Sequence, residues 1–199
     1  MRSCQRDATM SESGMRLFTA IDLPEPLADR LERLIARLRP HAPIRWSKVR
    51  NLHITTKFIG EWPEDRLEEV KSALSSVASR RPISIALHGF GWFPNPHRPR
   101  IFWIAVEGGQ ALRKLAADTE EALQGVGIPR EAREYRPHLT LARIEESDVD
   151  LALLRRAVAS LPERDWGEFV AENQHLYRSE ISRSGSQYTK LASFCFETC

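Results

Sequence analysis

The chain carries the pattern histidine–apolar–threonine twice, as His-Ile-Thr at 53–55 and as His-Leu-Thr at 138–140. Both copies lie in apolar-rich stretches typical of β-strands, in which residues two apart point to the same side. Each copy therefore presents an imidazole and a hydroxyl on one face and turns its apolar residue toward the core. Two such pairs facing one cleft supply an acid, a base and two hydroxyl donors, which suffice to break a phosphate ester.

Histidine has a pKa near neutrality, so one imidazole can accept a proton from water while another, protonated, gives a proton to a departing oxygen. Phosphoryl transfer also needs donors for the equatorial oxygens, where negative charge accumulates. Thr55 and Thr140 are placed to be such donors, and Arg143 could add a charge-assisted one. These residues predict His53 and His138 as the acid–base pair without saying which of them is the acid.

No other catalytic signature stands in the sequence. It contains no HExxH and no cysteine–histidine ligand spacing, so neither a metal site nor another cofactor is expected. The phosphate loop, the dinucleotide fingerprint and the GxSxG elbow are also missing. The remaining histidines lack a hydroxyl two residues on and are expected to be structural or at the surface; they are His41, His88, His97 and His175.

Composition is that of an ordinary globular chain: 199 residues, 42% hydrophobic, 28% charged, with a formal charge of +2. Such a small charge does not favour bulk nucleic-acid binding, so an anionic ligand must be met by a local arginine cluster. The three cysteines form no CxxC pair, and no membrane span or signal peptide is apparent. We therefore expect a cytoplasmic monomer that does not associate with membranes.

Hydrophobic spacing predicts an α+β fold. Residues 1–14 are polar and patternless and are expected to be a disordered extension, and 15–199 to form one domain. Helices are expected over 26–38, 67–77, 112–123 and 149–161, and a Pro/Gly-rich connection over 89–99. Strands are expected over 16–21, 44–46, 52–59, 83–87, 101–106, 138–144, 169–177 and 187–196. The similar order of elements around the two motifs predicts two pseudo-symmetric lobes, each a small, mainly antiparallel sheet backed by helices, with the active cleft between them.

Strict alternation along the two motif strands also predicts which neighbours share the face of the histidines. It places Lys57 beside Thr55 and turns Phe58 toward the core, and it places Ala142 on the face of His138. For substrate contacts we expect a further set of residues, namely Arg143, Phe18, Trp46, Arg100 and Tyr188. Trp103, inside an apolar strand, is expected in the core.

Four segments carry a family resemblance: RLFTAID at 16–22, NLHITTKFIG at 51–60, RPHLTLAR at 136–143 and the closing stretch 176–188. They resemble the RNA 2′,3′-cyclic phosphodiesterases, members of the two-histidine phosphoesterase superfamily also known as the 2′-5′ RNA ligase family. One departure is Thr56, where the family usually carries leucine. The resemblance implies a bilobal α+β fold. It also implies hydrolysis of RNA 2′,3′-cyclic phosphate ends to 2′-phosphates, with His53 as proton donor to the 3′ oxygen and His138 as proton acceptor from water.

Other functions stay open at this stage. Some members of that family also join or cleave 2′-5′ linkages reversibly without ATP, so 2′-5′ linked RNA is a second candidate partner. A long RNA should need a basic track beyond the cleft, and the near-neutral charge leaves open a cyclic phosphodiesterase that acts on a small nucleotide. A module that only binds RNA ends needs no acid–base pair, and a zinc-dependent hydrolase would lose its activity in EDTA.

Overall fold

The computed structural model describes residues 14–77, 81–146, 148–162, 165–182 and 185–196. The extension expected over 1–14 lies outside these residues except for Gly14, which begins the first strand. Within the described ranges, none of the helices is long and apolar enough to cross a membrane.

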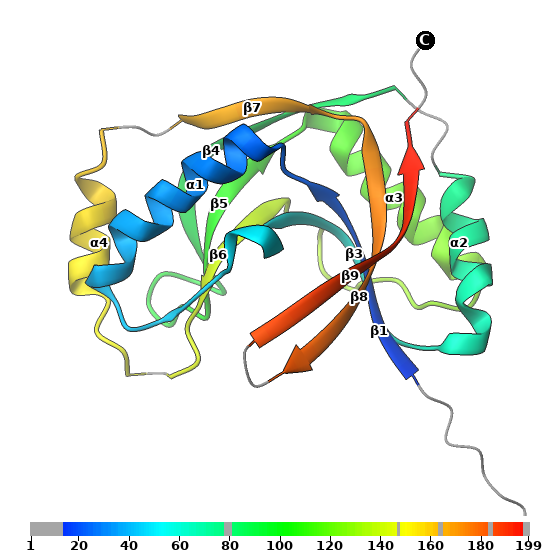
Figure 1. The fold of residues 1–199 in the computed structure, drawn as a ribbon, viewed down its shortest axis with the longest axis horizontal. Coiled ribbons are helices and arrows are strands. Elements are labelled where there is room, and N and C mark those ends of the chain that lie inside the picture. Colours follow the sequence, from blue (N-terminus) through cyan, green and yellow to red (C-terminus); the bar gives the residue numbers. More distant parts are fainter. Residues whose placement is uncertain (1–13, 78–80, 147, 163–164, 183–184, 197–199) are drawn as a thin grey trace, which may run out of the picture.

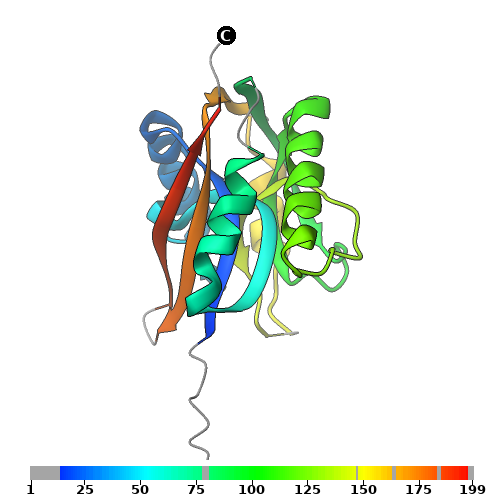
Figure 2. The ribbon, with the colours of Figure 1, turned by 90° about the vertical axis from the view of Figure 1, so that its right-hand side faces the viewer.

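The described residues form nine strands in one antiparallel sheet of order β7-β4-β5-β6-β3-β1-β8-β9, with β2 paired to β6. The strands are β1 Gly14–Asp22, β2 Arg45–Trp46, β3 His53–Pro63, β4 Ile83–Phe93, β5 Ile101–Glu107, β6 His138–Arg143, β7 Asp165–Ala171, β8 Asn173–Ser182 and β9 Gly185–Cys195. The sheet is curled, and the helices lie outside it (Figures 1 and 2). The α+β class expected from the sequence is confirmed.

The four α-helices are amphipathic and bury one apolar stripe each against the sheet. They are α1 Glu25–Leu38, α2 Leu67–Ser75, α3 Gly109–Gly125 and α4 Ala152–Ala159, and short 3-10 turns occupy Arg39–His41, Val49–Asn51 and Glu64–Arg66. α1 and α4 lie together over one half of the molecule, and α2 and α3 over the other (Figure 1). In α4, Leu154 is buried and Leu153 exposed, so the stripe expected through Leu153 is shifted by one residue.

The two lobes share a single sheet instead of holding separate ones. β1, β3, β8 and β9 make one half, and β4 to β7 make the other. The halves meet where β3 pairs with β6, at Ile54 opposite Leu139. Both residues are fully buried and are the apolar centres of the two His-x-Thr motifs. The seam between the halves therefore runs through the two motifs.

Two hydrophobic clusters fill the space between the sheet and the helices. The larger contains the apolar stripe of α1 and the inner residues of β4, β5 and β6, and the smaller lies among α2, β1 and β8. Helix α3 contributes to both, with Leu112 and Leu115 in the larger cluster and Leu123 in the smaller. One helix therefore ties the two halves together at the back of the sheet.

The expected strand 169–177 is two strands. β7 pairs with β4 in one half, and β8 pairs with β1 in the other. Glu172 stands between them, where the chain passes from one half to the other. Extended residues on both sides of this crossing have the same sequence pattern, so the change of partner left no signal in the sequence.

The expected connection 89–99 begins as a strand. β4 continues to Phe93 and pairs with β5 through Gly91 opposite Trp103, after a register shift at 88–91. Gly89 adopts a φ of 56°, which favours glycine and allows this irregularity. A Cβ on Gly91 would lie 2.0 Å from the indole of Trp103. Gly89 therefore permits the irregularity in β4, and Gly91 leaves room for the ring of Trp103. Both lie in a strand and not in the connection that the sequence suggested.

Candidate active site

A β-bulge interrupts alternation in β3 directly after the first motif. Thr55 pairs with Ala20 and Lys57 with Thr19, which leaves Thr56 as the extra residue. Thr56 and Lys57 are both buried, and Phe58 is 56% exposed. The placement of Lys57 beside Thr55 and of Phe58 in the core is therefore wrong, because one inserted residue reverses the faces of the residues that follow it, here up to a second register shift at Ile59.

β6 carries the same irregularity at the same distance from its histidine. Thr140 pairs with Trp103 and Ala142 with Phe102, so Leu141 is the extra residue. Leu141 and Ala142 are fully buried and Arg143 is exposed. Ala142 therefore belongs to the core and not to the face of His138. The bulge brings Arg143 back to the histidine face, at the position that Phe58 holds in the first motif.

The antiparallel pairing sets the two motifs against each other. Because Ile54 lies opposite Leu139, His53 faces Thr140 and Thr55 faces His138 across the strands. The apolar centres point to the helices, so all four polar side chains share one face. All four are half-buried. The pairing thus brings together the acid–base and hydroxyl groups that the sequence predicted.

Both imidazoles are held in the same way. Nδ1 of His53 lies 2.7 Å from the carbonyl oxygen of Asn51, and Nδ1 of His138 lies 2.8 Å from that of Arg136. A carbonyl only accepts, so Nδ1 carries the hydrogen in each ring. Nε2 is left in both histidines as the atom that can take up or release a proton.

Burial lowers the pKa of both histidines below the ordinary value of 6.5. For His53, the Asn51 carbonyl and the carboxylate of Asp22 oppose this effect, while the charges of Arg143 and His138 add to it. For His138, the Arg136 carbonyl opposes it and Arg143 adds to it. Arg143 therefore acts on both rings. A carboxylate favours the protonated form of His53, and no carboxylate is among the groups that act on His138.

Each histidine lies against a pair of aromatic rings. His53 is 4.8 Å from Phe18 and 5.3 Å from Tyr188 between ring centroids. His138 is 5.0 Å from Phe93 and 6.3 Å from Trp103. Trp103 is half-buried beside His138 and not in the core as expected. Phe93 was not predicted as a site residue, because it stood in the presumed connection.

The five residues expected at the substrate separate into two groups. Arg143, Phe18 and Tyr188 lie on the histidine face, although Phe18 is only 3% exposed and serves as a support beneath His53. Trp46 packs edge-on against the buried Phe102 and donates to the Ala42 carbonyl, which places it with the core. Arg100 donates to the carbonyl oxygen of Glu145, just beyond β6. Trp46 is therefore held against Phe102, a residue far away in the chain that the sequence spacing did not reveal.

A polar cluster beside His53 was not predicted. Asp22, which pairs with His53, accepts hydrogen bonds from the Tyr177 hydroxyl at 2.6 Å and from Lys190 at 2.7 Å. His175 Nε2 lies 3.5 Å from the same carboxylate, so its expected structural role agrees with its position. Burial would raise the pKa of Asp22, but the hydrogen bonds from Lys190 and Tyr177 hold it below its ordinary value. Asp22 lies on β1, His175 and Tyr177 on β8 and Lys190 on β9, so the pairing register of these three strands brings the cluster together.

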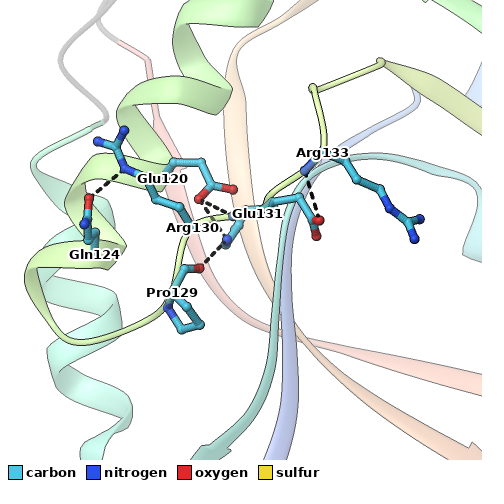
Figure 3. Close-up of polar contacts among 7 residues, drawn as sticks. Glu120, Gln124, Pro129, Arg130, Glu131 and Arg133 are labelled. Carbon is cyan, nitrogen blue, oxygen red and sulfur yellow. Dashed lines mark hydrogen bonds and ion pairs between the residues drawn. The ribbon is translucent and has the colours of Figure 1, made fainter.

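On the other side of the sheet, Lys57 ties β3 to the segment that leads into β6. Nζ of Lys57 lies 2.8 Å from a carboxylate oxygen of Glu120 and 2.9 Å from the carbonyl oxygen of Pro129. Figure 3 shows these two acceptors turned toward the same point. Tyr135 adds a second tie, with its hydroxyl 3.1 Å from the carbonyl oxygen of Thr55. The approach to the second motif is thus fastened to the strand of the first.

Thr56 belongs to a buried hydrogen-bond network behind the site. Its hydroxyl lies 2.7 Å from that of Thr19 and accepts from the Gln174 amide at 2.8 Å, which also reaches Thr119 at 3.0 Å. The threonine that departs from the usual leucine therefore has polar partners. Among the residues that the structure describes, no three His, Cys, Asp or Glu side chains gather as a metal site would require.

Comparison with known proteins agrees with this geometry. The family described as LigT like Phosphoesterase matches the chain twice, over residues 21–103 and 104–188, one copy for each histidine motif. Proteins named RNA 2′,3′-cyclic phosphodiesterase are 31% identical over 180 residues in Archaeoglobus fulgidus and 34% identical over 174 residues in Methanocaldococcus jannaschii. These alignments cover 90% and 87% of this chain and 99% and 96% of the relatives.

Solved structures show the same fold. A crystal structure from Thermus thermophilus aligns with a TM-score of 0.77 at 28% identity and covers 92% of this chain and 98% of that one. LigT of E. coli complexed with 3′-AMP aligns with a TM-score of 0.76 at 24% identity and covers 94% and 100%. The doubled motif, the fold and the relatives agree: the chain belongs to the LigT-like phosphoesterase family.

Proposed function

We propose that this protein hydrolyses RNA 2′,3′-cyclic phosphate ends to 2′-phosphomonoesters without a metal ion. The observation that carries the proposal is the antiparallel register that sets His53 against Thr140 and Thr55 against His138 on one face of the sheet. An acid and a base on neighbouring strands, each with a hydroxyl donor, match the needs of phosphoryl transfer. The relatives' name, RNA 2′,3′-cyclic phosphodiesterase, supports the choice of substrate.

In the proposed reaction, Nε2 of His138 takes a proton from water as the water oxygen bonds to phosphorus. The bond between phosphorus and the 3′ oxygen breaks, and Nε2 of His53 gives its proton to that oxygen. The products are a 2′-phosphate and a free 3′-hydroxyl. Thr55, Thr140 and Arg143 donate hydrogen bonds to the non-bridging oxygens. The Asp22 carboxylate favours a protonated His53, which supports its role as donor.

The test is hydrolysis of a short RNA ending in a 2′,3′-cyclic phosphate, with EDTA present and the product isomer identified by phosphorus NMR. We expect the 2′-phosphate, and a loss of about 10²–10⁴-fold in rate for His53→Ala and for His138→Ala. His41→Ala is the matched control, because His41 lies in the 3-10 turn Arg39–His41, which packs with α1 and α4 and not on the histidine face. A near wild-type rate for either active-site variant, or inactivation by EDTA, would contradict the proposal.

The same assay compares substrates. We take RNA as the preferred substrate and the enzyme as a cytosolic monomer. Equal kcat/KM for a nucleoside 2′,3′-cyclic phosphate and for the RNA would favour a small nucleotide instead. Incubation with a 5′-hydroxyl RNA partner and no ATP tests whether the reaction also runs toward a 2′-5′ linkage.

A further inference from the structure

Strand β9 lies at the edge of the sheet, yet three of its residues reach the neighbourhood of His53. The side chains of Tyr188 and Lys190 are two residues apart and so point to the same side of the strand, and the main-chain carbonyl of Ser186 lies two residues before Tyr188. The Ser186 carbonyl accepts from the Asn51 side chain at 2.8 Å, the Tyr188 ring lies edge-on to His53, and Lys190 bonds to Asp22. The β1–β8 pairing ends at Arg16 opposite Ser179, and beyond it the β8–β9 pair splays away from β1 (Figure 1).

Asn51 makes two hydrogen bonds beside His53, one to its ring and one to β9. Its carbonyl oxygen holds Nδ1 of His53 at 2.7 Å, and its side-chain amide donates to the Ser186 carbonyl. Two residues beyond Ser186, the ring of Tyr188 is 5.3 Å from the imidazole at an interplanar angle of 87°. The same residue thus orients His53 through its main chain and holds the strand that covers His53 through its side chain.

We propose that Asn51 is a positioning residue of the active site: its side-chain amide fastens β9 over His53, so that the ring of Tyr188 shields the imidazole from water. This rests on the proposed function for its catalytic consequence, but not for its structural one. Lys190 and Asp22 anchor β9 on the other side of Tyr188 at 2.7 Å. Tyr188 therefore lies between two anchors, and loss of the amide frees one side of it.

Apart from Tyr188 itself, the charged and titratable groups around His53 stay constant in the variants proposed here. They are Asp22 on β1, His138 and Arg143 on β6, His175 and Tyr177 on β8, and Lys190 on β9. Burial is the largest cause that lowers the pKa of His53. Removing the shield lessens this burial, so the pKa of His53 rises toward its ordinary value.

The experiment is an NMR titration of the His53 imidazole in the full chain without substrate. For Asn51→Ala and for Tyr188→Ala we expect the pKa of His53 to rise by about 0.5 units or more, and for the double variant no further rise. Tyr188→Phe keeps the ring and is expected to keep the wild-type value. Gln187→Ala is the matched control, because it removes an exposed amide next to Tyr188 on the other side of β9.

An unchanged pKa of His53 in Asn51→Ala would overturn the inference, as would additive shifts in the double variant. If Asn51→Ala does not fold, the outcome rests on Tyr188→Ala, whose unchanged value would be equally decisive. With substrate, kcat/KM should fall about tenfold in both variants, since a displaced catalytic group is less effective. A wild-type enzyme that fails to hydrolyse the cyclic phosphate contradicts the proposed function and leaves the titration result standing.

Discussion

At the scale of single residues, burial controls the proton affinity of the two histidines. Both imidazoles have lowered pKa values, and Arg143 contributes to each. The proposed reaction needs one ring protonated and the other neutral, so its rate is expected to fall above the pKa of the acid and below the pKa of the base. The positions of these two limbs are therefore set by the environment of the rings.

We expect kcat/KM to be bell-shaped in pH with both limbs below 6.5, because both pKa values lie below that ordinary value in the free enzyme. Arg143→Met removes a positive charge that disfavours protonation, so both limbs should move to higher pH. Rates measured between about pH 4 and pH 9 test this. A profile without an acid limb, or one unmoved by Arg143→Met, would contradict it.

The two threonines can be separated from the acid–base pair by isosteric variants. Thr55→Val and Thr140→Val keep the shape of the side chain but remove the hydroxyl donor. We expect a loss of about 10–1,000-fold in kcat with both pH limbs retained, comparable to loss of one oxyanion donor. Thr→Ser at either position should restore most of the rate. Two silent valine variants would mean that the hydroxyls contact no phosphate oxygen.

At the scale of elements, the β-bulges decide which side chains reach the site. Each motif strand has one extra residue directly after its threonine, at Thr56 in β3 and Leu141 in β6, and β3 has a second at Ile59. The following residue is buried, and the next one, Phe58 or Arg143, returns to the histidine face. A bulge is thus the device by which each half adds one more residue to the site.

The bulge also predicts the consequence of changing Lys57. Its ammonium is buried behind the sheet with the partly exposed Glu120, so Lys57→Met leaves that carboxylate with only the Glu131 backbone N–H and no counter-ion, and should lower the free energy of unfolding by about 2 kcal/mol. The rate of the folded enzyme should stay within about tenfold, because Lys57 does not reach the histidine face. Urea unfolding and the hydrolysis assay measure the two quantities.

Lys57→Met/Glu120→Leu is the matching control, since it replaces both charges and should recover part of the stability. A loss of activity as large as that of His53→Ala, without loss of stability, would return Lys57 to the catalytic face that strict alternation assigned to it.

At the scale of the whole molecule, the halves are joined on both sides. The sheet continues through Ile54 and Leu139, and α3 contributes to both hydrophobic clusters. Two histidines from different halves can keep a fixed geometry only if the halves do not move independently. The continuous sheet and the shared helix meet this need.

We therefore expect a single cooperative unfolding transition in urea. Trp62 lies in the smaller cluster and Trp166 in the larger one, so their fluorescence reports on different halves. Trp46, Trp92 and Trp103 lie on β2, β4 and β5 of the same half as Trp166, so in Trp62→Phe the remaining fluorescence reports that half alone. The fluorescence midpoint of Trp62→Phe should coincide with its midpoint by far-ultraviolet circular dichroism, which reports both halves. Two separated transitions would show that the halves unfold independently.

The class of fold followed from the sequence, and the chemistry is a prediction from it. The doubled His-x-Thr pattern predicted four candidate site residues that the structure places on one face, because a strand alternates with a period of two and a short motif contains its own geometry. The apolar stripes of the helices also followed from local spacing, with the one-residue shift at Leu153 as an exception.

Contacts between distant parts of the chain set the rest of the site. Arg143 and Tyr188 were expected at the substrate, and the bulge in β6 and the free end of β9 bring them to the histidines. Phe58, in place of Lys57, and Phe93 were not expected; the bulge in β3 exposes Phe58, and the extended strand β4 places Phe93 beside His138. Register, bulge position and strand partner depend on contacts between residues far apart in the chain. The local sequence pattern does not specify those contacts, so it could not predict the positions of Phe58 and Phe93.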